Sequence, residues 1–551
     1  MHVEPHSFFP KNIYWLLFAL LGLVYAIGLF VPLLDNDSAH HGNIALHMYL
    51  TGDYVQLIDE GKDYLDKPHL HFWLAAASYH LFGVTSFAYK FPSFLFTIFG
   101  LYSTYRLGKS LYFREVGKLA ALVMASAFAF ILANNDVRME AILTASIAFA
   151  TWQLVDWVNK KTFINIFGAA FGLALAFSTK GLIGVFVPAA GIFFYILYKK
   201  DWTRFYHWQL LLLVVSFFVF ISPVLYCYYL QYDMHTEKMI RGKTGWSGVK
   251  FILWQQTFER YEGKSFGGAG NKDYFFFFHS FLWAFAPWSI VAYIAFASRF
   301  RSFVSRQNEW LTIGTFLIMG LMITFSGFKL PHYINIIFPS TAILTAAYLI
   351  EAVNKQTLFR RLFTTQLVVC FVCIAAAMFI NLWAFPLKNW LVIVVTVLVI
   401  VAGLIIFRML QSPFRKLVGL SVLTSVFIFY LLNSNFYPQL LTYQAGNELA
   451  LATREKVDPK TVYFWPLLYN PSFQFYSKQL KKDFTDSVLQ EDHPVWILTD
   501  RNSLHQLKEK NLPMFQQYAH RDYNIGTMKL PFINPATRQS TLDTLFLTRV
   551  K

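Results

Sequence analysis

The sequence predicts an all-α polytopic membrane bundle of about 13 transmembrane helices. We expect juxtamembrane helices on its outer face and a small C-terminal α/β domain outside the cytoplasm. The 551-residue chain is 56% hydrophobic and only 14% charged, whereas soluble domains carry roughly 25% charged residues. Its mean hydropathy is +0.42. The apolar residues come in blocks of about 20, the length that crosses a bilayer as a helix with every backbone hydrogen bond satisfied internally.

These blocks give the membrane domain, residues 1–434, its order of helices. We expect spans at 13–34, 86–107, 115–134, 138–158, 163–179, 181–198, 206–229, 274–297, 309–326, 331–352, 362–384, 389–409 and 414–434. The first block is too long for a cleavable signal peptide and lacks a small-residue cleavage site, so we expect it to be retained.

The positive charges predict the orientation of the bundle. The net charge of +16 could suggest nucleic acid, but Lys and Arg gather in short loops on one face, which is then cytoplasmic by the positive-inside rule. The N-terminus is expected on that side. An odd number of spans places everything after residue 435 on the other side. The three cysteines, Cys227, Cys370 and Cys373, lie inside apolar blocks, which favours a buried structural role over a redox or metal site.

The tail, residues 435–551, is more polar and is predicted to form one small α/β domain. TVYFWPLL and PVWILTD are candidate strands, and QAGNELALATREK and NSLHQLKEK are candidate helices. The chain shows no internal repeat, which weighs against an inverted-repeat transporter.

Two outer loops, residues 35–85 and 230–273, hold polar residues of a candidate catalytic face. The first begins with DNDSAHH, which contains Asp37, and continues as a short helix with its apolar residues at helical spacing. Lys67 precedes a proline and is therefore held extended, so that its ammonium can point into a cleft. An ordinary interfacial lysine is the alternative. The second loop contributes Arg260.

Further ionisable residues stand at two helix junctions of the same face. NNDVRME places Arg138 and Glu140 at the start of a predicted span, where a charge is costly unless it is paired or functional. A local pair between Arg138 and Glu140 that closes the turn is the alternative. SGFKLPHY places Lys329 just before a helix that begins with proline.

The motifs of this face resemble those of the polytopic, lipid-carrier-dependent glycosyltransferases of the GT-C fold (family 39), which include protein O-mannosyltransferases and the bacterial aminoarabinose transferase of lipid A. In the bacterial branch an Asp-Glu pair ends the first span, and Asp37-Ser38 stand in that place here. The other matching motifs, in order between residues 13 and 350, are Asp66-Lys67-Pro68 with Phe72-Trp73-Leu74, Thr179-Lys180-Gly181, Glu259-Arg260-Tyr261, Pro287-Trp288-Ser289 and Lys329-Leu330-Pro331-His332-Tyr333.

The resemblance implies a polyprenyl-phosphate-linked sugar donor and transfer, with inversion, to an outer-leaflet acceptor. A lipid A-like glycolipid, a glycan or a protein would be the acceptor, at the inner (plasma) membrane of the cell. Asp37 is the expected general base, with Glu140 as the second catalytic candidate. The expected ligands of the carrier phosphate and donor are Lys67, Arg138, Lys180, Arg260, Lys329 and Tyr333.

No metal or other cofactor is expected. Some relatives carry a histidine after the long loop, where this chain has Asn271. The neighbouring His40 and His41 point to different faces of a helix, so polar contacts to a sugar or headgroup are a better interpretation than a shared metal.

Two other functions stay open. A transporter or flippase of lipid-linked glycans would place its ionisable residues at mid-helix, along a path between the two faces. A structural partner in an envelope assembly would use the tail as a binding module. The clustering of charges on one side favours the enzyme.

Overall fold

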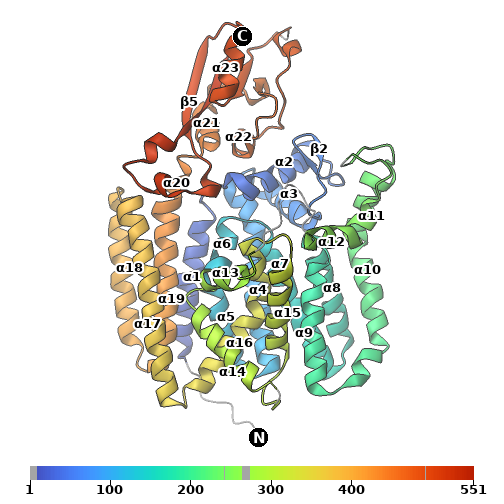
Figure 1. The fold of residues 1–551 in the computed structure, drawn as a ribbon, viewed down its shortest axis with the longest axis vertical. Helices are drawn as coiled ribbons and strands as arrows, with labels where there is room; N and C mark the ends of the chain where they lie inside the picture. Colours follow the sequence, from blue (N-terminus) through green and yellow to red (C-terminus); the bar gives the residue numbers. More distant parts are fainter. Residues whose placement is uncertain (1–8, 241, 263–272, 304, 491) are drawn as a thin grey trace.

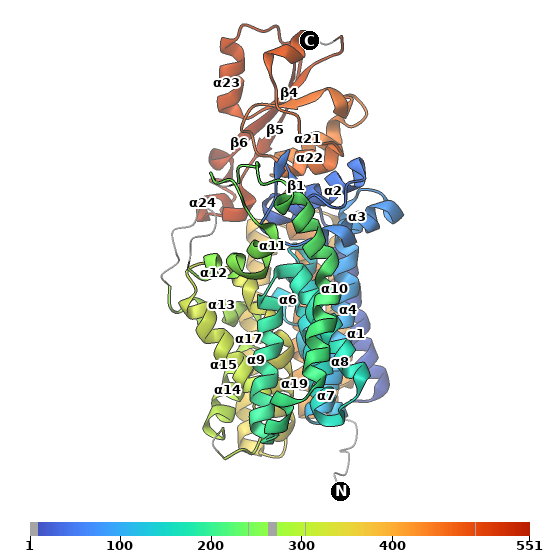
Figure 2. The same cartoon turned by 90° about the vertical axis from the view of Figure 1, so that its right-hand side faces the viewer.

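The computed structural model describes residues 9–240, 242–262, 273–303, 305–490 and 492–551. Long helices stand side by side as a bundle, and the C-terminal region lies on the end opposite the N-terminus (Figure 1). In the view turned by 90°, the strands of that region still lie beyond the end of the bundle that carries α2 (His40–Thr51) and α3 (Leu70–Phe82) (Figure 2).

The bundle consists of long helices joined mostly by short turns. They are α1 (Lys11–Gly28), α4 (Ser86–Leu111), α5 (Arg114–Ala125), α6 (Phe128–Asn135), α7 (Glu140–Lys160), α8 (Phe163–Lys180), α9 (Ile183–Lys199), α10 (Gln209–Tyr228), α13 (Phe276–Ala284), α14 (Ser289–Arg301), α15 (Leu311–Phe325), the 3₁₀ turn η5 (Pro331–Ile337) with α16 (Phe338–Ala352), α17 (Gln356–Met378), α18 (Trp390–Met409) and α19 (Pro413–Leu431).

Within the described ranges, eight helices are long and apolar enough to cross a membrane, or nine if the bent pair α5 and α6 counts as one span. The chain is therefore a mostly helical, multi-pass membrane protein, as its composition predicts. The number of 13 spans and the assignment of the two faces stay predictions.

Two of the expected continuous helices are broken, and hydrogen bonds connect the two breaks. The segment expected at 115–134 bends by 55° between α5 and α6. The segment expected at 274–297 is divided into α13 and α14 at Pro287, which has no N–H to continue a helix. The backbone N–H of Phe128 donates to the carbonyl of Ala286 at 2.9 Å, and the indole of Trp288 donates to Ser126 Oγ at 2.9 Å. Polar groups freed inside the bundle are thereby satisfied.

The helices differ sharply in their environment. The apolar window of α7 is 94% buried, whereas that of α18 is only 11% buried. Helix α7 is therefore the centre of the bundle, and α18 faces lipid. A charged group at the start of α7 lies among protein atoms, where it needs a partner.

The outer loops fold into short elements above the bundle. They are the π-helical turn η1 (Asp35–Ala39), α2 (His40–Thr51), β1 (Ile58–Asp59), β2 (Lys62–Asp63), α3 (Leu70–Phe82), η3 (Tyr229–Asp233), α11 (Gly248–Lys250), η4 (Phe251–Gln255) and α12 (Gln256–Tyr261). The helix expected after Asp37 is confirmed as α2. Its apolar residues Ile44, Ala45 and Met48 are fully buried, so they pack against protein and not against lipid.

The tail contains α20 (Tyr437–Leu441), α21 (Ala445–Thr453), β3 (Val462–Phe464), α22 (Pro471–Ser477), β4 (Trp496–Thr499), α23 (Arg501–Glu509), β5 (Gln516–Asp522), α24 (Leu530–Ile533) and β6 (Asp543–Arg549). The strands form one sheet in the order β3-β4-β6-β5, with β3 and β4 parallel and the other neighbours antiparallel. The two predicted strands and two predicted helices are present as β3, β4, α21 and α23. The strands β5 and β6 were not predicted.

The tail is fixed to the bundle by buried contacts. Phe475 of α22 packs with Tyr79 of α3, and the hydroxyl of Tyr476 accepts a hydrogen bond from the backbone N–H of Leu33 at 2.8 Å. On another side, the guanidinium of Arg538 lies 4.1 Å from the ring centroid of Phe385. These contacts hold the tail against the segment that carries Asp37.

Candidate functional site

The candidate site begins at η1, where the chain leaves α1. Asp37 Oδ2 lies 2.9 Å from a terminal guanidinium nitrogen of Arg138, and the Asp37 side chain is 44% exposed. A carboxylate that is held in place yet accessible can meet an incoming hydroxyl group. The hydroxyl of Ser38, which replaces the second acid of the family pair, donates to Asp136 Oδ1 at 2.7 Å.

The turn between α6 and α7 separates two charges that are close in sequence. Met139 is buried with φ 80, a left-handed conformation that is strained for a residue with a side chain. Before this turn, Arg138 pairs with Asp37 and also with Asp136 at 2.6 Å. After it, Glu140 forms its ion pair elsewhere. The alternative of a local Arg138–Glu140 pair is therefore wrong.

Glu140 and Lys180 form a buried ion pair across the bundle. Lys180 Nζ lies 2.5 Å from Glu140 Oε1, with the two side chains 6% and 2% exposed. His332 Nε2 is 3.5 Å from the same carboxylate oxygen, and Lys180 Nζ lies 4.4 Å from the ring centroid of Tyr333. Three sequence motifs, from α7, the end of α8 and η5, thus meet at one point.

The Thr-Lys-Gly motif ends α8 in a way that aims Lys180. Gly181 has φ 73, which favours glycine, and a Cβ there would lie 2.7 Å from Gln256 Oε1. The chain can therefore turn sharply into α9 beside α12, while the side chain of Lys180 stays at the helix end. Gly181 is required for both the turn and the close approach.

Lys67 lies near the same group. Its ammonium contacts the carboxylate of Asp66, and its side chain is 12% exposed, which is less than expected of an ordinary interfacial lysine. Lys67, Arg138 and Lys180 all act electrostatically on the imidazole of His332. Lys180 shares the carboxylate of Glu140 with His332.

Arg260 and Lys329 have no described contact with the charged group around Glu140. Arg260 belongs to α12, which borders the cavity described next, but its side chain lies outside the described residues. Lys329 donates to the carbonyl of Asp273 at 2.8 Å and lies 5.5 Å from the ring centroid of Tyr274. Within the described part of the chain it forms no hydrogen bond or ion pair with Asp37 or Glu140.

An apolar cavity of about 560 Å³ ends at this charged group. Lys180 and Tyr333 line its polar end. Most of the remaining wall is apolar and comes from α7, α9, α15 and the segment 254–258. It includes Leu143, Phe186, Trp254, Phe258, Met319 and Ile323. The volume falls within the roughly 300–1,000 Å³ of typical ligand sites. A long hydrocarbon chain with a charged head fits such a cavity.

A group of histidines lies behind Asp37 in the outer layer. Burial lowers the pKa of His71 to about 4 and that of His41 well below its usual value. His71 shares a hydrogen bond with the hydroxyl of Tyr89 at 2.9 Å, and that hydroxyl donates to the carbonyl of Val137. These rings are neutral at physiological pH, and the hydroxyl of Tyr89 links His71 to the 136–140 turn.

The tail contributes residues that sequence reasoning did not select. The hydroxyl of Tyr469 lies 2.6 Å from His40 Nδ1, and His40 Nε2 lies 3.5 Å from Asp59 Oδ2. Lys481 Nζ pairs with Glu60 Oε2 at 2.9 Å. Tyr469 and Lys481 lie more than 400 positions from their partners His40 and Glu60, and no local motif marks them. The tail therefore forms part of the rim around η1.

No metal site emerges among the described residues, because they contain no cluster of three or more His, Cys, Asp or Glu side chains suited to hold an ion. Asn271, at the position where some relatives have a histidine, lies outside the described residues.

Comparisons with known proteins agree with this geometry. The family described as dolichyl-phosphate-mannose-protein mannosyltransferase matches residues 66–227. Undecaprenyl phosphate-alpha-4-amino-4-deoxy-L-arabinose arabinosyl transferase 2 of Proteus mirabilis (strain HI4320) is 21% identical over 346 residues, which are 61% of this chain and 60% of that protein. The match therefore leaves about two fifths of the relative's length uncovered.

Solved structures share the fold of the whole chain. The crystal structure of ArnT from Cupriavidus metallidurans bound to undecaprenyl phosphate superposes with a TM-score of 0.73 at 14% identity, covering 98% of each chain. The Archaeoglobus fulgidus oligosaccharyltransferase in its apo form gives a TM-score of 0.51 at 10% identity, covering 93% of this chain and 74% of the other. In motifs, sequence and fold, the chain is thus similar to the polyprenyl-phosphate-sugar-dependent glycosyltransferases of the GT-C fold.

Proposed function

We propose that this protein is an integral membrane glycosyltransferase that moves a sugar from a polyprenyl-phosphate donor to an acceptor on the extracytoplasmic face of the inner membrane. The observation that carries the proposal is the apolar cavity lined by Lys180 and Tyr333. Lys180 pairs with Glu140, which follows by two residues the Arg138 that holds the accessible carboxylate of Asp37. The isoprenoid chain would occupy the cavity. The phosphate would then lie at the group of cations.

The residues supply the two requirements of the reaction. The acceptor oxygen forms a bond to the anomeric carbon while the bond from that carbon to the phosphate oxygen breaks, and polyprenyl phosphate leaves with the electron pair. Cations near the phosphate stabilise the charge that develops on it. Lys67 and Lys180 have this role, together with Arg260 and Lys329 by resemblance. Asp37 takes the proton of an acceptor hydroxyl, with inversion at the carbon.

Arg138 has a positioning role in this scheme. It holds Asp37 and Asp136 in one chain of ion pairs, so the carboxylate of Asp37 keeps a fixed direction. Glu140 is better described as the partner of Lys180 than as a second base, because its side chain is 2% exposed and its carboxylate already faces an ammonium. Asp37 is therefore a stronger candidate for the catalytic base than Glu140.

The acceptor class follows from the relatives by analogy alone. A lipid A-like glycolipid is the first candidate, because the named bacterial relatives are aminoarabinose transferases. A glycan or a protein is the second, because of the family match at residues 66–227.

The test is to purify the protein with native lipids, identify bound isoprenoid phosphates by mass spectrometry and measure transfer. We expect polyprenyl phosphate to copurify. The Asp37→Asn variant should retain the carrier but lose transfer, whereas Glu237→Gln, which changes an exposed carboxylate of the second outer loop, should behave like the native protein. Absence of any isoprenoid phosphate from active protein would contradict the donor assignment.

A transporter of lipid-linked glycans is the competing function. The described ionisable residues of the site lie at helix ends, at η1 and at the starts or ends of α7 and α8. A path between the two faces would instead need them at mid-helix. Transport of the carrier without any sugar transfer, in the same purified protein, would favour the competitor.

A further inference from the structure

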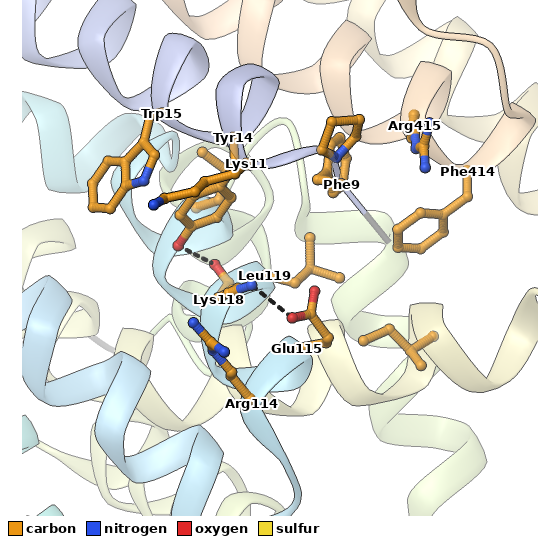
Figure 3. A pocket seen from close by; sticks show the side chains of 13 residues that line it. Phe9, Lys11, Tyr14, Trp15, Arg114, Glu115, Lys118, Leu119, Phe414 and Arg415 are labelled. Carbon is orange, nitrogen blue, oxygen red and sulfur yellow. Dashed lines mark hydrogen bonds and ion pairs between the residues drawn. The ribbon is translucent and has the colours of Figure 1, made fainter. Parts of the chain in front are cut away.

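A second cavity lies at the end of the bundle opposite the candidate site, beside the start of α1 (Figure 3). Its volume is about 440 Å³. Side chains from α1, α5, α16 and α19 surround it. The proposed glycosyltransferase reaction makes no use of this end of the molecule.

Both cationic and apolar side chains line this cavity. Among the described residues, four cations line it, Lys11, Arg114, Lys118 and Arg415, against one carboxylate, Glu115. Glu115 is already neutralised by Lys118, whose Nζ lies 2.7 Å from Glu115 Oε1.

Two of the cations are available to an anion from outside. Lys11 and Arg114 are exposed and form no ion pair with the described residues. Both stand in the first turn of a helix, Lys11 in α1 and Arg114 in α5. Helix N-termini present unsatisfied backbone N–H groups and a positive dipole end, which favour an anion.

The apolar part of the lining fits hydrocarbon. Phe9 and Phe414 lie 6.0 Å apart between ring centroids, and Leu119 and Leu122 are buried behind the cavity. Trp15 borders the opening with its side chain 59% exposed. Tryptophan with one face apolar and one polar end is typical of a membrane–water interface.

We propose that this cavity binds the phosphate-bearing headgroup of an anionic phospholipid, with the lipid's glycerol and upper acyl region against Phe9, Phe414 and Leu119. Basic pockets between transmembrane helices are known to suit such headgroups. A soluble phosphate would satisfy Lys11 and Arg114 equally well but would leave the apolar wall uncovered, so the lipid is the better occupant.

The test uses the full-length protein in nanodiscs of phosphatidylglycerol mixed with phosphatidylcholine. Each basic side chain near an anionic surface strengthens binding roughly 5-fold. The double variant Lys11→Gln/Arg114→Gln should therefore hold phosphatidylglycerol roughly 25-fold more weakly, as read from lipids retained in native mass spectrometry. The variant Arg114→Lys should retain most of the binding.

The matched control is Lys199→Gln/Lys200→Gln, two exposed lysines at the end of α9 that do not line the cavity. The control should retain phosphatidylglycerol like the native protein, and thermal unfolding should be unchanged in both double variants. Equal retention by the cavity variant and the control would overturn the proposal. Binding of inorganic phosphate to the native protein in neutral detergent, without preference for phosphatidylglycerol over phosphatidylcholine, would overturn the assignment to a lipid.

Discussion

The buried ion pair between Lys180 and Glu140 predicts a large and specific loss of stability when either partner is removed. Loss of one partner from a buried pair costs roughly 3–5 kcal/mol, because a charge is left uncompensated. In Glu140→Gln the ammonium keeps the ring of Tyr333 at 4.4 Å, a cation–π contact that contributes roughly 1–2 kcal/mol when desolvated. We therefore expect a loss near the lower end, about 3 kcal/mol. In Lys180→Met, Glu140 keeps His332 at 3.5 Å, and we expect a larger loss.

The double variant Glu140→Gln/Lys180→Met removes both charges and should recover most of this stability, since an apolar replacement of a buried pair is often neutral. Equilibrium unfolding in mixed detergent micelles would measure all four proteins as a double-mutant cycle. The chain offers a matched control in Lys510 and Asp486, whose charged atoms also lie 2.5 Å apart but whose side chains are 39% and 72% exposed. Asp486→Asn should cost at most about 1 kcal/mol.

Stability and carrier retention together separate two roles of Lys180. A stable double variant that no longer retains polyprenyl phosphate would show that Lys180 also binds the phosphate. A stable double variant with full retention would limit Lys180 to a structural role. If Glu140→Gln proves as stable as Asp486→Asn, the reasoning from burial is refuted.

Four further expectations concern separate parts of the molecule. Asp37→Asn should lower turnover of a hydroxyl acceptor by roughly 10²–10⁴-fold while the carrier stays bound, and full activity would exclude Asp37 as the base. A reporter fused after residue 445 should be extracytoplasmic and one near residue 303 cytoplasmic; equal sidedness would refute the odd number of spans. Lys481→Met leaves Glu60 without its partner from the tail, which should lower the stability of the tail by about 2–3 kcal/mol. Hydrogen exchange of β3 should therefore become faster. Unchanged exchange would contradict a role of Lys481 in docking the tail. Burial lowers the pKa of His71 to about 4, below the roughly 6.5 of the unfolded chain; its contribution is therefore complete above pH 6.5 and is lost as the pH falls toward 4. At pH 5 the loss is on the order of 2 kcal/mol, and His71→Gln should show less acid destabilisation in the same unfolding assay.

The membrane part of the fold could be predicted because its signal is local. A block of apolar residues long enough to cross a bilayer has few options besides a helix, and each predicted span overlaps a helix or a pair of helices. The breaks could not be predicted in the same way. The kink after α5 depends on the carbonyl of Ala286, some 160 positions later, which accepts from Phe128.

The tail shows the limits of hydrophobic patterns more clearly. The strands β3 and β4 are buried throughout and read as apolar runs. The strand β5, with the sequence QQYAHRD, lies at the edge of the sheet with mostly exposed residues. Its pairing with β6 is made by backbone groups, which every residue except proline possesses, so its sequence carries little signal.

The sequence predicted which residues form the candidate site, but it did not predict all of the ion pairs between them. A charge at the start of a buried helix needs compensation, and this indicated that Glu140 was special. Its partner could not be chosen by sequence distance, because Arg138 is two positions away and Lys180 is 40. The left-handed turn at Met139 decides between them. Such a turn carries no signature here, since methionine rarely adopts it.

The charges of the site also restrict how a phosphate can be bound. Arg138 is shared by Asp37 and Asp136, Lys180 faces Glu140, and Lys67 faces Asp66. Each of these three cations thus already has a carboxylate partner. A sugar phosphodiester that enters this group must compete with a carboxylate for its cation, unless a carboxylate takes up a proton or a further cation approaches.

The exposure of each ion pair indicates which carboxylate a phosphate can displace at the lower cost. Glu140 is 2% exposed and cannot move into water without opening the bundle, whereas Asp66 is 31% exposed beside Lys67. A phosphate can therefore displace Asp66 from Lys67 at lower cost than it can displace Glu140 from Lys180, because the released carboxylate regains its hydration. Under the proposed function, we therefore expect Lys67 to be the first ligand of the phosphate. We expect Lys180, held by Glu140 and lining the apolar cavity, to lie where the hydrocarbon ends and the charged head begins.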